Sequence, residues 1–80
     1  MRLDKYLKVS RIIKRRSIAQ QACDAGKVAL NGRVAKPSST VSVGDTITVS
    51  LGQRSTAYQV LIVEETVRKE DAGDMVRVIE

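Results

Sequence analysis

Residues 15–45, RRSIAQQACDAGKVALNGRVAKPSSTVSVGD, contain the change from helical to alternating periodicity from which the fold can be predicted. Ser17 is a good N-cap residue, and Gln20 stands three residues later, as a capping box requires. Apolar side chains at helical spacing then predict a helix from 18 to about 25. Gly26 suits the C-terminal cap of that helix, because glycine takes a positive φ without a steric penalty.

Beyond this helix, apolar and polar side chains alternate, which predicts strands. Asn31-Gly32 is the strongest short hairpin signal and favours a type I′ turn, after which Val34 is expected to point toward the core. Residues 46–51 alternate clearly and predict a further strand. The segment 57–63 is more continuously apolar, which predicts a strand that is central or curved.

A second helix is predicted at the N-terminus, over residues 3–9, because Leu3, Tyr6 and Leu7 form one apolar stripe. Near the other end of the chain a short helix is favoured at 69–76, although the last residues also fit a strand. The assembled pattern predicts a small, single α+β domain. Its two short N-terminal helices pack on a small antiparallel or mixed sheet.

The composition excludes several classes of protein. The 80 residues form one domain, and no run of about 18 apolar residues exists that could span a membrane. The N-terminus lacks the apolar core of a secretory signal, so we expect a cytoplasmic protein without a membrane partner. Cys23 is the only cysteine and is expected to be a small buried residue. Histidine is absent and no metal-ligand cluster or phosphate-binding glycine loop occurs, so we expect no enzyme, no cofactor and no metal.

Positive charge is concentrated in one half of the chain. Residues 1–40 contain ten Lys or Arg and two Asp, a net charge of +8, whereas residues 41–80 contain four Lys or Arg and seven Asp or Glu, a net charge of −3. This asymmetry is typical of a protein that binds a polyanion; the alternative is a basic surface that is merely solvated. A different class of function is a protein-interaction module that docks its basic face on an acidic partner. The acidic residues near the C-terminus are expected to form a solvated face.

A phosphate-binding site is predicted where three cations, Lys14, Arg15 and Arg16, directly precede a helix N-terminus. The helix dipole is positive there, so a bound anion would offset the repulsion and accept hydrogen bonds from free backbone N–H groups. Asp4 either orients Arg2 or another guanidinium, or is an ordinary surface carboxylate. The predicted RNA-binding residues are Arg2, Lys5, Lys8, Arg11, Lys14, Arg15, Arg16, Arg33 and Lys36.

The scarcity of aromatic side chains indicates the kind of RNA. Tyr6 and Tyr58 are the only aromatics, and Tyr6 is expected in the core because it lies on the apolar stripe. Proteins that bind single strands stack the bases on aromatic rings. Structured, double-helical RNA that is recognised through its backbone is therefore favoured.

Eight sequence elements, in register, resemble the S4-type RNA-binding domain, also called the alpha-L motif. They are the opening RLDKYLK, Arg16-Ser17, Ala19, Gly26, Val28, Asn31-Gly32, Pro37-Ser38 and Gly44-Asp45. The resemblance spans residues 2–51 and implies the alpha-L fold. It places an RNA-binding domain over 1–64 and an acidic C-terminal extension, packed on or beside it, over 65–80.

The N-terminal stretch MRLDKYLKVSRIIKRRSIAQ is similar to stand-alone members of this family, the ribosome quality-control factors related to heat-shock protein fifteen. The resemblance implies binding to a large ribosomal subunit that is obstructed by peptidyl-tRNA. It further implies contacts with ribosomal RNA and tRNA, action beside other quality-control factors, and support of C-terminal alanine tailing. We expect a monomer.

Overall fold

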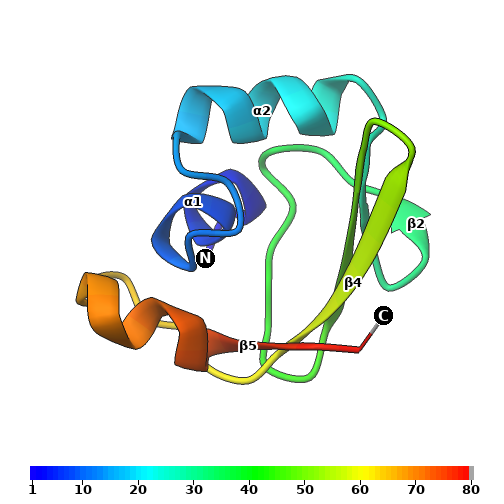
Figure 1. Cartoon of the computed structure of the whole chain (residues 1–80). Helices are drawn as coiled ribbons and strands as arrows, with labels where there is room; N and C mark the ends of the chain where they lie inside the picture. The colour runs from blue at the N-terminus through cyan, green and yellow to red at the C-terminus, as the bar shows by residue number, and fades with distance from the viewer. Residues whose placement is uncertain (80) are drawn as a thin grey trace.

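Helices cover one side of a five-stranded sheet in the computed structural model, which describes residues 1–79 (Figure 1). The elements in chain order are α1 (Leu3–Val9), α2 (Arg16–Asp24), β1 (Val28–Leu30), β2 (Arg33–Val34), β3 (Thr46–Leu51), β4 (Arg54–Val60), the 3-10 helix η1 (Lys69–Met75) and β5 (Val76–Val78). The strand order is β2-β1-β3-β4-β5, and every neighbouring pair is antiparallel. The predicted α+β class is therefore confirmed.

The N-terminal end of α2 differs from the prediction. The helix begins at Arg16 rather than at residue 18, and its N-cap, Arg15, makes no side-chain capping hydrogen bond. The capping box of Ser17 and Gln20 is therefore wrong. Gln20 instead donates a hydrogen bond to the buried carboxylate of Asp4 over 2.8 Å.

The C-terminal end of α2 confirms the glycine cap. Gly26 has a φ of 75°, and its N–H donates to the carbonyl of Cys23 over 3.0 Å. The N–H of Lys27 donates to the carbonyl of Ala22 over 2.9 Å. These two bonds form a Schellman motif, which satisfies carbonyls that the end of a helix leaves unpaired.

The hairpin at Asn31-Gly32 is confirmed, with φ values of 53° and 83° that suit a type I′ turn. The inward orientation of Val34 is wrong, since this side chain is 69% exposed. Val34 pairs with Ala29 across the hairpin, so both lie on the sheet face opposite to that of Val28, which is fully buried. The register thus turns Ala35, and not Val34, toward the core.

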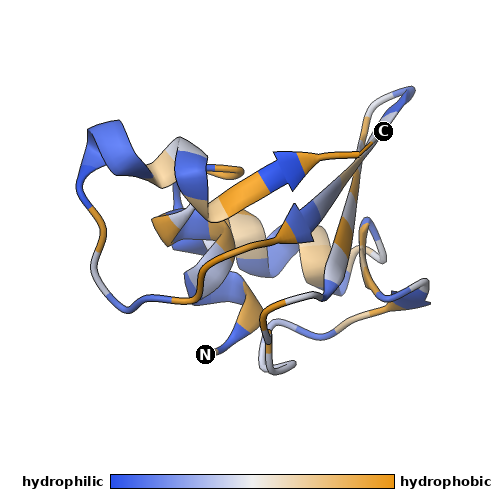
Figure 2. Ribbon diagram, turned by 90° about the horizontal axis from the view of Figure 1, so that it is seen from below, coloured by the Kyte–Doolittle hydropathy of each residue, from blue (hydrophilic) through white to orange (hydrophobic). Residues whose placement is uncertain are grey.

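The remaining strands follow the sequence pattern with two shifts. The predicted strand over 46–51 is confirmed as β3. β4 covers residues 54–60, so it begins and ends three residues earlier than predicted, and it lies between β3 and β5 as a non-edge strand. The helix predicted at 69–76 is present as η1. The last residues, which also fitted a strand, form β5 directly after it. Figure 2 shows hydrophobic and hydrophilic residues alternating along β5.

The core lies between the helices and the sheet. Its fully or almost fully buried apolar side chains are Leu3, Tyr6, Leu7, Ala19, Cys23, Val28, Val41, Ile47, Val49, Val60, Ala72 and Met75. Burial raises the pKa of the Cys23 thiol, and the charges of Asp4 and Asp24 raise it further. Cys23 is therefore protonated at neutral pH, and it is buried, as predicted. Within residues 1–79, every helix is too short or too polar to cross a bilayer.

Tyr6 is confirmed as a core residue, and its hydroxyl connects α1 to the C-terminal part of the chain by hydrogen bonds. The hydroxyl donates to two carbonyl oxygens, that of Ile62 over 2.9 Å and that of Met75 over 3.0 Å. Burial raises the pKa of Tyr6 to about 12, so this donor stays protonated. Met75 is itself fully buried, and β5 pairs with β4. The division of the chain at residue 64 stays a prediction.

Gly26→Ala tests the helix cap. The added Cβ meets no atom within 4 Å, so the whole cost comes from the positive φ. We expect the free energy of unfolding to fall by about 1 kcal/mol, with a fall in Tm of about 4–8 °C. Gly73→Ala is the matched control, because Gly73 also has open space and lacks a positive φ. Equal melting curves for the two variants would contradict the assignment of the cap.

Candidate nucleic-acid interface

A buried carboxylate joins the N-terminal turns of the two α-helices. Asp4, in the first turn of α1, is 0% exposed. Its Oδ1 accepts from the Nε of Arg2 over 3.2 Å and from the backbone N–H of Lys5 over 2.8 Å. Its Oδ2 accepts from the Nε2 of Gln20 over 2.8 Å and lies 3.3 Å from the Nε of Arg16. The last two residues belong to α2, so Asp4 fixes one helix against the other.

The pKa of Asp4 shows how strongly these donors act. Burial by itself would raise the pKa of this carboxyl. The hydrogen bonds from Gln20, Arg16, Arg2 and the Lys5 backbone outweigh burial and lower the pKa from 3.8 to about 2. Asp4 is therefore charged at neutral pH. Of the two roles that the sequence left open, orientation of guanidinium groups is correct.

Two arginines are oriented in this way at the surface. The side chains of Arg2 and Arg16 are 52% and 43% exposed, while each contacts the fully buried Asp4. A guanidinium has five N–H donors, so the contact with Asp4 leaves donors of both residues available to a ligand. Because the ion pairs hold the side chains, less conformational entropy is lost when a phosphate binds.

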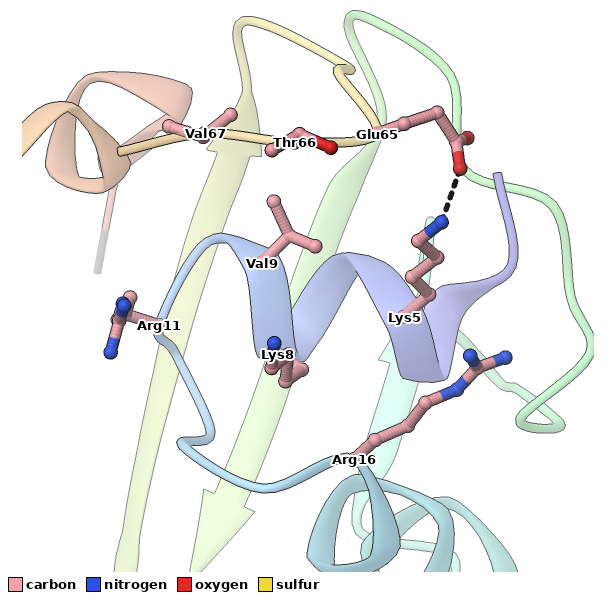
Figure 3. A pocket seen from close by; sticks show the side chains of 8 residues that line it. All are labelled: Lys5, Lys8, Val9, Arg11, Arg16, Glu65, Thr66 and Val67. Atoms are coloured by element: carbon pink, nitrogen blue, oxygen red, sulfur yellow. Dashed lines mark hydrogen bonds and ion pairs between the residues drawn. The ribbon is translucent and has the colours of Figure 1, made fainter. Parts of the chain in front are cut away.

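An open groove of about 290 Å³ lies beside this cluster (Figure 3). It is lined by Lys5, Lys8, Val9, Arg11, Arg16, Glu65, Thr66 and Val67. Four of the predicted RNA-binding residues thus gather in one concavity. In Figure 3, α1 lies between Arg16, which begins α2, and the segment that leads from β4 to η1, while Arg11 follows the end of α1.

The other predicted residues lie outside the groove lining. Arg2 belongs to the Asp4 cluster, Lys14 and Arg15 are exposed in the segment before α2, and Arg33 is exposed on β2. Lys36 is exposed just beyond β2. The loop that follows Lys36 contacts the start of α1, where the N–H of Leu3 donates to the carbonyl of Ser39 over 2.7 Å.

The N-terminus of α2 keeps backbone donors available. Within residues 1–79, the N–H groups of Ser17 and Ile18 donate to no protein acceptor, and the N-cap Arg15 provides no side-chain cap. This end of the helix therefore has the uncapped donors that anion binding requires. Arg16, the first residue of the helix, lines the groove, so the donors and the cationic groove are adjacent.

Arg11 has an unusual backbone conformation. It follows α1 with a φ of 66°, and its N–H donates to the carbonyl of Lys8 over 3.1 Å. Position C′ of a helix is commonly glycine in this conformation, because a side chain is strained there. The charge of Arg11 made it a candidate from the sequence, but no local pattern indicated this conformation.

Glu65 was missed as a residue of the site, since the acidic residues of the C-terminal half were expected to form a solvated face. Its carboxylate accepts a hydrogen bond from the Nζ of Lys5, as Figure 3 shows. The same hydrogen bond lowers the pKa of Glu65. Sixty positions separate the two residues, so no local pattern could have linked them.

Residues 1–47 match the model of the S4 domain. The chain belongs to the S4 domain family. The matched residues of this S4 domain include both α-helices, the hairpin and the start of β3, so they contain the whole Asp4 cluster. The resemblance inferred from the motifs of the sequence is therefore confirmed.

Relatives and a solved structure resemble this S4-domain chain over nearly its full length. A protein of Halalkalibacterium halodurans named "RQC P-site tRNA stabilizing factor" is 46% identical, covering 98% of this chain and 89% of its own. A Bacillus subtilis protein of the same name is 47% identical and covers 99% and 92%. The structure of Vibrio cholerae heat shock protein 15, described as trimeric, has a TM-score of 0.90 at 34% identity, covering 98% and 80%.

Asp4→Asn tests the buried carboxylate. The pKa of Asp4 is lower in the folded protein than its ordinary value of 3.8, so its contribution to stability is full above pH 4 and is lost as the pH falls through about 2. We expect the variant to lose about 2–4 kcal/mol of unfolding free energy at pH 7. It should also show a shallower loss of stability between pH 4 and 2 in urea titrations. Asp24→Asn, at an exposed position, is the control; an equal loss in both variants would contradict the role of Asp4.

Proposed function

We propose that this S4-domain protein is a non-catalytic RNA-binding protein of ribosome-associated quality control. In this proposal it binds the large ribosomal subunit that is obstructed by peptidyl-tRNA, contacts ribosomal RNA and the tRNA, and supports C-terminal alanine tailing of the stalled chain. It acts in the cytoplasm as a monomer beside other quality-control factors. The names of its relatives, which refer to P-site tRNA, support this role.

The observation that carries the proposal is the convergence of oriented arginines, further cations and free helix donors on one surface. Arg2 and Arg16 are held by Asp4, and Lys8 and Arg11 line the adjoining groove. Arginine binds phosphate through two parallel hydrogen bonds, which fixes the orientation of the backbone as well as adding affinity. We propose that the predicted residues outside the groove, Lys14, Arg15, Arg33 and Lys36, extend this surface along the RNA.

The kind of RNA follows from the aromatic residues. Tyr6 is fully buried and its hydroxyl is engaged, so its ring offers no stacking platform. Tyr58 packs against the core from β4. Recognition through phosphates and riboses of a folded RNA therefore suits this surface better than recognition of stacked single-stranded bases.

Arg16→Ala tests the proposal directly. We expect binding to large ribosomal subunits carrying P-site tRNA to weaken about tenfold, because one oriented phosphate contact is removed. If the wild-type protein contacts four to six phosphates, a plot of log affinity against log salt concentration should have a slope of about −4 to −5. For the variant this slope should be less negative by about one unit. Arg54→Ala removes an equal charge at an exposed site on β4 and should bind like wild type.

Two results would oppose the proposal. If Arg16→Ala melts like the parent and still binds with wild-type affinity, the proposed phosphate site at Arg16 is wrong. Binding to the particles that persists undiminished after digestion of the exposed ribosomal RNA would favour an acidic protein partner for the basic surface.

Arg11→Gly separates function from stability. Glycine relieves the strain of the positive φ, so the free energy of unfolding should rise by up to about 1 kcal/mol. Affinity for the same particles should fall several-fold, since a groove cation is lost. Arg11→Lys keeps both the charge and the strain, so its stability should match wild type. A glycine variant with unchanged or lower stability would show that the conformation at Arg11 stores no strain.

A further inference from the structure

One side chain in the groove is negatively charged and would repel a phosphate. Glu65 lines the groove together with Lys5, Lys8, Arg11 and Arg16, and its side chain is 67% exposed. The Nζ of Lys5 donates to its carboxylate, so this carboxylate, carried by the segment that leads from β4 to η1, lies against α1 at the Lys5 end of the groove (Figure 3). In the free protein it partly neutralises the groove.

A carboxylate restricts which polyanions fit beside it. When ionised it accepts hydrogen bonds and donates none, so it repels the oxygens of a phosphate and is favourable only beside a donor. On a nucleic-acid backbone, the donor nearest to the phosphates is the ribose 2′-hydroxyl, which RNA has and DNA lacks. The hydrogen bond that Lys5 donates to Glu65 holds the carboxylate at the groove while the other cations bind phosphates.

We propose that Glu65 is a specificity-determining residue of the groove, which accepts a hydrogen bond from a ribose 2′-hydroxyl and so disfavours polyanions without that donor. This inference rests on the proposed RNA-binding function and names a selectivity within the same site. Thr66 and Val67 continue the wall beyond Glu65, where they face Val9 of α1. The sugar of the bound strand then lies against this less polar wall and the phosphates against the cations.

The experiment compares two ligands of one shape. The first is a synthetic RNA hairpin, and the second is the same hairpin with every ribose 2′-O-methylated, which keeps the phosphates and removes the hydroxyl donor. Affinities are measured for the full chain, for Glu65→Gln and for Glu64→Gln. Glu64 is the matched control, since it is exposed, adjacent and of equal charge, and it makes no hydrogen bond or ion pair with residues 1–79.

The expected result is a change in the ratio of the two affinities. The wild-type protein should prefer the hydroxylated hairpin, and Glu65→Gln should reduce this preference about three- to tenfold, chiefly by tighter binding of the methylated ligand. Glu64→Gln should shift both affinities alike and leave the ratio unchanged. A ratio in Glu65→Gln that equals that of wild type or of Glu64→Gln would overturn the inference. Failure of the wild-type protein to bind either hairpin would instead overturn the RNA-binding function itself.

Discussion

Removal of a carboxylate from water strongly disfavours its charged form unless several donors surround it. Asp4 meets this condition only where α1 and α2 lie in one relative position, because Arg2 and the Lys5 backbone come from one helical turn and Gln20 and Arg16 from the other helix. The same contacts determine where two guanidinium groups stand at the surface. The packing of the helices and the geometry of the proposed phosphate site therefore depend on one buried charge.

The position of the segment that leads from β4 to η1 depends on the apolar core. Tyr6 binds the carbonyls of Ile62 and Met75, and the carbonyl of Met75 also accepts from the N–H groups of Leu61 and Ile62. These bonds hold the segment after β4 alongside α1, which brings Glu65 to Lys5. One helix thus contributes its apolar face to the core and its cationic face to the groove, which is economical in an 80-residue chain.

Local chemistry made much of the fold predictable. The hairpin turn and the cap of α2 need positive φ values, which few residue types adopt. Asn31-Gly32 and Gly26 therefore indicated the hairpin and the end of α2 correctly. Two side chains were misassigned because the tertiary structure offered each of them a second position. Gln20 was assigned to its own helix end, although the buried Asp4 offers a charged acceptor. Val34 was assigned to the core by alternation, although the hairpin register places it outside.

The sequence by itself determined the α+β class, the S4-type motifs and the concentration of cations in the first 16 residues, since composition, turn residues and periodicity act over a few neighbouring positions. Only the tertiary structure decided which of these cations share a groove, that Asp4 is buried between two guanidinium groups, and that Glu65 faces Lys5. The physical reason is distance along the chain. The contacts Asp4–Arg16 and Lys5–Glu65 join residues 12 and 60 positions apart. They are determined by the packing of the whole core, which a pattern of neighbouring residues does not reveal.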